Sequence, residues 1–339
     1  MERHGIIGAG NWIIDKVKTI DRWPGEGNLC NILSTVQAAG GGPANVLFDL
    51  AAMDPDLPLY AAGLIGNDDD GNYLMQEIQQ RGIDSTYMKR TDKYATSFTD
   101  AMSGNGKRTF FHCRGANAAL DAADLDNIDI PAKFFYLAYL LLLDRLDAAD
   151  PEFGTVAARL LASLRKKGYR TVVDFVSEAP EKFRRVVLPA LPHIDILIVN
   201  EIEASACSGV ELRREDNTLN YRNLPAALDF LFAHGVHETA VIHFPEGAAG
   251  RTCDGKFVYA PSCHIETADI VGSTGAGDAF CAGVIYALHQ GLELSEALKL
   301  GSASSYFNLR SATASGGAVP LKTMQEFLRD CSWNAVPRF

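Results

Sequence analysis

The chain has 339 residues, of which 47% are hydrophobic and 22% are charged, and its 31 basic and 42 acidic residues give a formal net charge of −11. These proportions are ordinary for a globular protein and exclude a disordered, collagen-like or coiled-coil chain. The acidic balance argues against non-specific binding of nucleic acid, and an anionic substrate would need a local positive feature to hold it.

The N-terminal third begins with elements of an α/β fold. Residues 6–8 and 57–62 are apolar enough to be sheet strands. Between them, residues 43–53 predict a helix, because proline is favoured in a first helical turn and good helix formers follow Pro43.

Two further segments of this region look extended and have no partner helices. They cover residues 12–40 and 94–114. Within the second, residues 96–102 and 108–113 predict a hairpin around a Gly-rich turn. We expect the two segments to form a small β lid on the α/β body.

The segment from residue 131 to 244 alternates apolar runs with amphipathic helical stretches. Continuous apolar strands separated by helices indicate a parallel sheet covered on both faces. Ligands lie beyond the carboxyl ends of such strands, so Asp174 and Asn200, at two of these ends, are candidate site residues. The apolar runs are residues 134–139, 171–175, 194–200 and 239–244, and the helical stretches include 151–167 and 224–234.

Nothing in the sequence predicts export, a membrane span or a metal cluster. The N-terminus has no apolar run long enough for a signal peptide, and the longest such run, residues 134–143, is about half a membrane span. The seven cysteines include no C-x-x-C pair, so we expect no structural disulfides and a cytoplasmic location. Neither Cys263 with His264 nor His234 with His237 has a second half at zinc-site spacing.

The G-A-G at residues 8–10 follows a strand but does not predict a dinucleotide site. Ile13 stands where the third glycine of G-x-G-x-x-G belongs, and the residues after it resemble a strand rather than a helix. Without a helix N-terminus there is no cradle for a pyrophosphate. Asn11 and Asp15, at the exit of this strand, are either turn-capping residues or site residues.

The segment G-S-T-G-A-G-D-A at residues 272–279 is the strongest local signal. It has the glycine spacing of a phosphate loop and precedes an apolar helix over 279–289, but Asp278 stands where that loop carries Lys. Backbone amides at a helix start can hold developing negative charge while Asp278 accepts a proton from an attacking hydroxyl. The alternative is a Gly-rich helix cap with a favourable Asp in its first turn.

The N-E-I-E segment at residues 200–203 follows an apolar strand. Asn200 and Glu203 are placed to organise Mg²⁺ through water, as hard cations with few protein ligands usually are. Taken alone, the pattern is more typical of a helix start with Asn as its cap.

Together these pieces resemble the ribokinase-like, or PfkB-type, carbohydrate kinase family over residues 4 to 330. The most specific segments are G-G-P-A-N at 41–45 and S-T-G-A-G-D-A-F at 273–280. Supporting segments follow in the expected order: G-N-W-I-I-D (10–15), G-L-I-G-N-D-D-D-G (63–71), R-T-F-F-H-C-R-G-A-N (108–117), N-E-I-E (200–203) and G-A-A-G (247–250).

The resemblance implies a three-layer α/β/α sandwich with a mostly parallel central sheet and a small β lid, all within one domain over 1–339. It implies transfer of the γ-phosphate of ATP, with Mg²⁺, to a hydroxyl of a sugar. By motif, Asp278 would be the base, and Gly275, Ala276 and Gly277 would form the anion hole. The acceptor would contact Asn11, Asp15, Gly41, Gly42, Asn45 and Arg108, and the nucleotide and Mg²⁺ would contact Asn200, Glu203, Gly247, Gly250, Ser273 and Thr274.

Two positions depart from the family pattern. Gly272 replaces an Asp that helps to hold a monovalent cation near the anion hole, which argues against potassium activation. Pro245 stands where a Thr often touches nucleotide phosphate, so the nucleotide pocket is expected to be altered.

Three further expectations stay open. The nearest alternative to a sugar kinase is a nucleoside kinase, since G-N-x-x-x-D at 10–15 is similar to adenosine kinases. A second alternative is a family member that binds ligands or partners without catalysis. Exposed lid edges also favour a homodimer formed through the lid. The identity of the acceptor and of its reacting hydroxyl cannot be read from the sequence.

Overall fold

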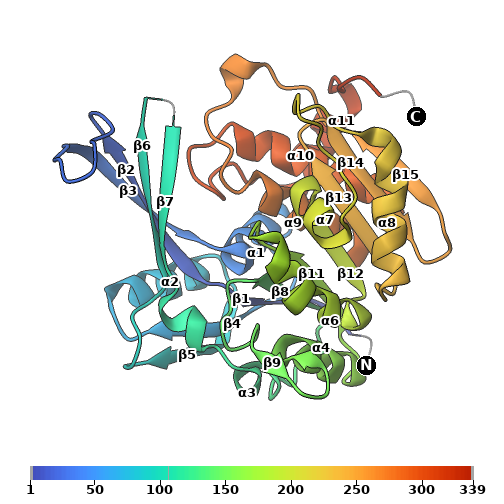
Figure 1. The fold of residues 1–339 in the computed structure, drawn as a ribbon, viewed down its shortest axis with the longest axis horizontal. Coiled ribbons are helices and arrows are strands. Elements are labelled where there is room, and N and C mark those ends of the chain that lie inside the picture. Colours follow the sequence, from blue (N-terminus) through green and yellow to red (C-terminus); the bar gives the residue numbers. More distant parts are fainter. Residues whose placement is uncertain (1–2, 106, 337–339) are drawn as a thin grey trace.

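A nine-stranded sheet runs through the centre of the molecule (Figure 1). The computed structural model of the chain describes residues 3–105 and 107–336. The seven strands from β13 to β5 run parallel, and β14 and β15 complete one edge as an antiparallel pair. In sheet order the strands are β15 (Phe257–Pro261), β14 (Gly247–Thr252), β13 (Thr239–Phe244), β12 (Ile196–Asn200), β11 (Arg170–Phe175), β8 (Phe134–Leu140), β1 (Ile6–Gly10), β4 (Leu59–Gly66) and β5 (Asp84–Thr91).

The four apolar runs of the middle segment are confirmed as β8, β11, β12 and β13. Almost every residue of these strands is buried, as expected for parallel strands with both faces covered. Their boundaries differ slightly from the prediction, since β8 and β11 each extend one residue further and β12 begins two residues later. In the N-terminal third, β4 covers Leu59–Gly66 rather than 57–62.

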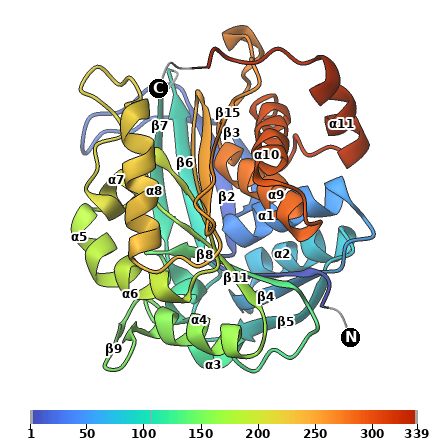
Figure 2. The same ribbon diagram turned by 90° about the vertical axis from the view of Figure 1, so that its right-hand side faces the viewer.

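Helices cover both faces of this sheet, which confirms the three-layer sandwich (Figure 2). Alternate strand residues point to opposite faces. In β8, Phe135 and Leu137 join one apolar cluster, while Phe134 and Tyr136 join the other. The first face carries α3 (Ala122–Leu125), α4 (Val156–Lys166), α7 (Glu201–Ser208) and α8 (Leu224–Ala233), and the second carries α1 (Gly42–Met53), α2 (Asp69–Gln80), α9 (Ala276–His289), α10 (Leu294–Leu309) and α11 (Leu321–Asp330).

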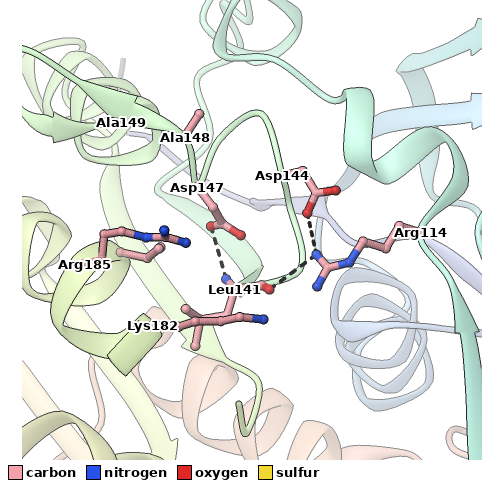
Figure 3. A pocket seen from close by; sticks show the side chains of 9 residues that line it. Arg114, Leu141, Asp144, Asp147, Ala148, Ala149, Lys182 and Arg185 are labelled. Atoms are coloured by element: carbon pink, nitrogen blue, oxygen red, sulfur yellow. Dashed lines mark hydrogen bonds and ion pairs between the residues drawn. The ribbon is translucent and has the colours of Figure 1, made fainter. Parts of the chain in front are cut away.

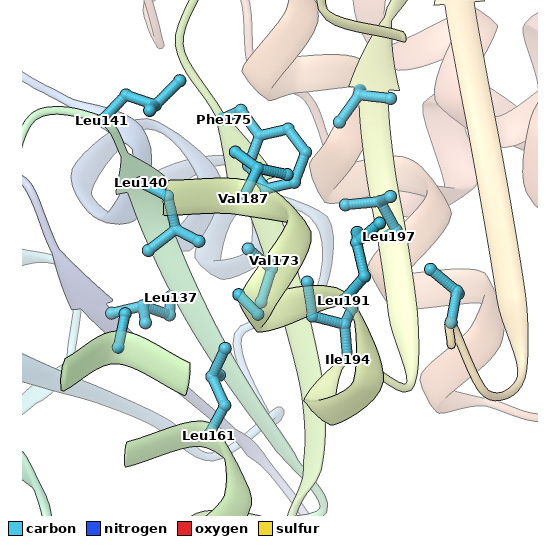
Figure 4. Packing of buried hydrophobic residues seen from close by; sticks show 14 of the residues in the cluster. Leu137, Leu140, Leu141, Leu161, Val173, Phe175, Val187, Leu191, Ile194 and Leu197 are labelled. Atoms are coloured by element: carbon cyan, nitrogen blue, oxygen red, sulfur yellow. The ribbon is translucent and has the colours of Figure 1, made fainter. Parts of the chain in front are cut away.

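The first cluster packs tightly between strands and helices. Leu137, Val173 and Leu197 project from three neighbouring strands toward Leu161 and Leu191 (Figure 4). The covering segment after β11 contains four short helical pieces, α5 (Pro180–Lys182), the π-helical η2 (Phe183–Val187), α6 (Leu188–Ala190) and the 3₁₀ piece η3 (Leu191–His193).

A separate four-stranded sheet is built from the two extended segments. Its order is β3 (Ile32–Gly40), β2 (Ile13–Ile20), β6 (Phe98–Gly104) and β7 (Lys107–Cys113). The β6–β7 pair is the predicted hairpin, whose turn includes residue 106, outside the described residues. The two outer pairs are antiparallel, whereas β2 and β6 run parallel because they come from separate excursions of the chain.

Some elements differ from the sequence prediction or were not predicted. The helix expected over 151–167 begins only at Val156, where Thr155 caps it, and the short strands β9 (Ala149–Asp150) and β10 (Gly154–Thr155) precede it. The helices α2, α10 and α11 and the strands β5, β14 and β15 were not assigned from sequence. Three further 3₁₀ turns are η1 (Gly115–Ala119), η4 (Tyr221–Asn223) and η5 (Thr267–Asp269). Among the described residues, no helix combines the length and apolar character needed to cross a membrane.

Candidate active site

The N-terminus of α9 is the centre of the candidate site. Gly275 caps this helix with a φ of +79°, and a Cβ there would lie 2.4 Å from the Ala314 carbonyl oxygen, so only glycine fits. Asp278 lies in the first turn. The backbone N–H groups of Gly277 and Asp278 have no acceptor among residues 3–105 and 107–336, whereas that of Ala276 donates to Ser273 at 3.3 Å. The free amides give this helix end a partial positive charge aimed at solvent.

The Asp278 carboxylate is buried and held by two side chains from other elements. Asn45 of α1 donates from Nδ2 to Oδ2 at 2.7 Å, and the Tyr139 hydroxyl, at the end of β8, donates to Oδ1 at 2.6 Å. Burial raises the pKa of Asp278 to about 6, although the two hydrogen bonds oppose the shift. Asp278 is therefore a positioned carboxylate that titrates close to neutral pH.

Asp15 of β2 faces the same region. Burial, and then the charge of Asp278, raise the pKa of Asp15 to about 6. A Cβ at Gly40 would lie 2.1 Å from Asp15 Oδ2, so glycine at this position leaves room for the carboxylate. The structure thus brings Asp15, Asn45 and Asp278 together and adds Gly40 to them.

Asn11, Gly41 and Gly42, three more of the predicted acceptor residues, lie beside this group and make close packing contacts. Asn11 is buried, and its Oδ1 accepts a 2.7 Å hydrogen bond from Asn117. A Cβ at Gly41 would lie 1.9 Å from the Asn11 carbonyl oxygen, and one at Gly42 would lie 2.6 Å from Ala138 Cβ. These glycines let the start of α1 approach β1 and β8 closely, which places Asn45.

Asn200 and Glu203 form a capping box at the start of α7, as the helix-start alternative predicts. Asn200 Oδ1 accepts from the Glu203 amide at 2.8 Å, and Glu203 Oε2 accepts from the Asn200 amide at 3.0 Å. Burial raises the pKa of Glu203 to about 7. Burial and the charge of Glu203 hold the pKa of Asp174 well above its usual range.

Asp174, Glu203 and Asp278 line one cavity of about 260 Å³. Three carboxyl groups that share a cavity and repel one another fit a divalent cation, because its charge would relieve the repulsion. No three His, Cys, Asp or Glu side chains in the described part of the chain form a metal cluster by themselves. Glu203 and Asp174 would therefore hold a divalent cation such as Mg²⁺ through water, and the cation would supply positive charge at this cavity.

A second, larger pocket of about 520 Å³ adjoins this cavity. Asn200, His243 and Gly277 line both spaces. Its walls are mostly apolar, and they include Ile265, Ile270, Phe280, Tyr306 and Leu309. The pocket is of the size and character that suit a flat heterocycle.

The predicted nucleotide residues divide into two groups. Asn200, Gly247 and Ser273 line the larger pocket, as does Pro245. Gly250 lies in β14, where a Cβ would lie 3.0 Å from Leu294 Cδ2, and it lines neither space. Thr274 also lines neither space, but its Oγ1 accepts a 2.7 Å hydrogen bond from Arg108 of β7.

Arg108 contacts Thr274, which lies just before α9, so the face of the small sheet that carries Arg108 is the one directed toward α9. Strand register places Asp15, Phe110 and Arg108 on one face. Lys16 and Phe111 lie on the other face, where Lys16 Nζ forms a 2.6 Å ion pair with Asp70 of α2. The small sheet therefore presents one face to the candidate site and the other to α2.

A hollow of about 250 Å³ lies at the base of this sheet (Figure 3). Arg114, which follows β7, donates to Asp144 at 2.6 Å and lies 3.6 Å from Glu178. Lys182 pairs with the same Glu178 at 2.7 Å. These ion pairs connect the exit of β7 with the segments that follow β8 and β11.

Three residues of the site were not assigned roles from sequence. Tyr139 contacts Asp278 although 139 positions separate them; the sequence suggested that this strand-end side chain contributes to the pocket, but not which residue it contacts. His243, the residue before the last of β13, lines both spaces, and burial lowers its pKa to about 4. Asp49 lies one turn after Asn45, is fully buried, and has no hydrogen-bond partner among the described residues. The sequence signals that could have indicated them are the position of Tyr139 and His243 near strand ends, and the acidic residue Asp49 within an otherwise apolar helix.

A family model for the pfkB family of carbohydrate kinases matches residues 10–320. A ribokinase of Staphylococcus aureus is 24% identical over 321 residues, which cover 93% of this chain and 96% of that protein. An adenosine kinase of Schizophyllum commune is 24% identical over 278 residues, which cover 78% and 76%.

Solved structures share the fold. The ribokinase of Arabidopsis thaliana, complexed with ribose and ATP, superposes with a TM-score of 0.78 at 19% identity, covering 97% of this chain and 99% of that one. The nucleoside kinase of Methanocaldococcus jannaschii, an archaeal member of the ribokinase family, gives a TM-score of 0.74 at 17% identity, covering 97% and 98%.

Proposed function

The chain belongs to the pfkB family of carbohydrate kinases, enzymes that phosphorylate hydroxyl groups, and we propose that it transfers the γ-phosphate of ATP to a hydroxyl of a sugar-like acceptor. The observation that carries this proposal is the Asp278 carboxylate, held by Asn45 and Tyr139 at the N-terminus of α9. Asp15 lies close enough to Asp278 for the charge of Asp278 to raise the pKa of Asp15. An acceptor hydroxyl that donates to Asp278 is thereby oriented beside free backbone amides.

Proton transfer and charge stabilisation are separate tasks of this site. Asp278 takes the proton of the acceptor hydroxyl, and a positioned base of this kind contributes about 10²- to 10⁴-fold. The amides of Gly277 and Asp278 stabilise charge on the transferring phosphoryl group. Mg²⁺, when bound with ATP, neutralises phosphate charge, and Asp174 and Glu203 would hold its water shell.

The base is tested by Asp278→Asn. We expect turnover to fall by at least about 100-fold, because the amide cannot take the proton. ATP binding, measured by calorimetry, should stay within a few-fold of the wild type. Asp129→Asn, on an exposed loop, is the matched control. Near-normal turnover of the Asp278 variant would contradict the assigned role.

We also propose that residues 12–40 and 94–114 act as a lid on a single α/β domain. The support is that Arg108 already reaches Thr274 from the face that carries Asp15. An acceptor bound between this face and α9 would be shielded from water, which strengthens the electrostatics of the site.

A nucleoside acceptor is favoured by one feature of the lid. Phe110 is 59% exposed and shares the site-facing side with Val17 and Val36. An apolar surface this close to Asp15 suits a base more than a bare sugar, because bases stack on aromatic rings.

The two acceptor classes are separated by a pair of neighbouring variants. Phe110→Ala should raise the KM for nucleosides several-fold and leave the KM for free sugars unchanged. Phe111→Ala is the matched control, because Phe111 is 58% exposed on the same strand but faces away. Equal effects of the two variants on nucleoside KM would contradict a base-stacking role for Phe110.

We further propose a cytoplasmic homodimer that pairs through the lid. All seven cysteines lie within the described residues and are unpaired, as a reducing compartment would leave them. Leu33 is 65% exposed on the edge strand β3 of the small sheet, where pairing with another copy would cover it. Light scattering at micromolar concentration should give twice the chain mass, and Leu33→Asp should halve it; a monomeric wild type would refute the proposal.

A further inference from the structure

One wall of the 520 Å³ pocket comes from residues beyond the family match. That match ends at residue 320, but Asn334 lines the pocket together with Ser262 and Cys263. The C-terminal segment after α11 is thus part of the pocket that Asn200, Gly247 and Ser273, three of the predicted nucleotide residues, also line.

Backbone hydrogen bonds fix this segment against the chain that follows β15. The His264 amide donates to the Ser332 carbonyl at 2.8 Å, and the Asn334 amide donates to the Ser262 carbonyl at 2.9 Å. Cys263 and Trp333 form an antiparallel bridge between them. The Cα of Asn334 is therefore held as firmly as a strand residue.

Side-chain contacts determine which way the Asn334 amide points. The Ser262 hydroxyl donates its only hydrogen to the Pro245 carbonyl at 2.8 Å, so it can only accept from Asn334 Nδ2, 2.7 Å away. Asn334 Oδ1 then faces His264 Nδ1 at 3.0 Å and accepts its hydrogen. In agreement, the hydrogen bonds to Asn334 and then Glu266 raise the pKa of His264.

An amide held in this way has one N–H and one oxygen lone pair left over. This donor–acceptor pair complements the Watson–Crick edge of adenine, where the amino donor lies beside the N1 acceptor; Asn makes an equivalent two-bond pair with the amino group and N7 of adenine elsewhere. Ile265, Ile270 and Tyr306 line the same pocket and offer apolar surface to a base.

We infer that Asn334 reads the base of the phosphoryl donor and selects adenine over guanine. The inference rests on the proposed kinase function and adds to it a specificity residue from the C-terminal segment. Guanine presents a carbonyl acceptor where adenine presents its amino donor, so the Asn334 oxygen would face a second acceptor.

The decisive variant is Asn334→Asp. A carboxylate only accepts hydrogen bonds, so it loses the match to the adenine Watson–Crick edge and gains one to the N1–H and amino donors of the guanine Watson–Crick edge. We expect Kd for ATP to rise about 10- to 100-fold, since a bidentate base contact has roughly that worth. Kd for GTP should fall or stay constant, so the preference reverses. Asn334→Ala should weaken ATP binding and leave GTP binding nearly unchanged.

Binding is measured by calorimetry with ATP and GTP, with Mg²⁺ and without acceptor, alongside thermal unfolding. Asn223→Ala, at an Asn that bonds a backbone carbonyl and lines neither space of the site, is the control. A parallel loss of ATP and GTP affinity in both Asn334 variants would show a structural role and overturn the inference. A wild type that binds neither nucleotide would instead refute the proposed function, so the two failures are distinguishable.

Discussion

At the residue scale, Tyr139 influences the charge of Asp278 as well as its position. The base must be ionised to accept a proton, and burial places its pKa at about 6, so kcat/KM should fall as pH drops below that value. The Tyr139 hydrogen bond lowers this pKa. Tyr139→Phe removes it, and the acid limb of the kcat/KM profile should move to higher pH. Tyr169→Phe, at a buried hydroxyl bonded to backbone carbonyls of residues 128 and 130, should leave the limb in place. An unmoved limb in the Tyr139 variant would contradict the argument.

Ionised Asp15 lowers the stability of the folded protein, because it is buried and lies near the charge of Asp278. Its pKa rises from 3.8 to about 6 on folding, so the folded state binds the proton more tightly than the unfolded state. The resulting stabilisation is complete below pH 3.8 and is lost as pH rises through 6. Asp15→Asn should therefore raise the free energy of unfolding at pH 8 by up to about 3 kcal/mol and change it little at pH 4. Urea unfolding at the two pH values measures this, and an equal effect at both would exclude the titration of Asp15 as the cause.

At the scale of the element, α9 uses two glycines for different purposes. Gly275 has a positive φ and no room for a Cβ, whereas Gly277 is helical and a methyl group there would lie 3.2 Å from His243 Cε1. Gly275→Ala should lower the free energy of unfolding by about 1–3 kcal/mol. Gly277→Ala gains up to about 1 kcal/mol of helix propensity but makes a tight contact with His243, so it should destabilise the protein less than Gly275→Ala. It should lower kcat about 10-fold or more by filling the space between the two pockets.

Gly291→Ala is the control for the conformational cost of placing Ala at a positive φ, as in Gly275→Ala. Its φ is +77° and nothing lies within 4 Å of the position that a Cβ would take, so Gly291→Ala measures the conformational cost alone. Equal losses of stability for Gly275→Ala and Gly291→Ala would show that the Ala314 contact is unimportant. Unchanged kcat in Gly277→Ala would remove this glycine from the anion site.

The same helix shows what could be predicted from sequence. The start of α9, its acidic first turn and the buried strands follow from local patterns, since glycine spacing and apolar runs are properties of neighbouring residues. The contacts of Asp278 with Asn45 and Tyr139 cross 233 and 139 positions, and no local pattern specifies such pairs. Asn334 lies further still from any motif, and its orientation depends on a hydroxyl, a carbonyl and an imidazole brought together only by folding.

At the scale of the whole molecule, the net charge of −11 repels an approaching anionic ligand at long range. The backbone amides at the start of α9 attract the ligand only at short range. Repulsion between distant charges is screened by salt, with a Debye length of about 30 Å at 0.01 M and about 10 Å at 0.1 M. The association rate constant of ATP should therefore rise, roughly two-fold, between about 10 and 150 mM NaCl.

Stopped-flow fluorescence of Trp333, which pairs with Cys263 beside the larger pocket, gives the rate without a label. The dissociation rate should change less, since it depends on contacts at short range, where screening is weak. An association rate that falls with salt would contradict the prediction, because it requires a positive field at the pocket mouth strong enough to outweigh the whole molecule. Arg108, exposed beside Thr274, is the side chain that could supply that field, and Arg108→Ala would then abolish the fall.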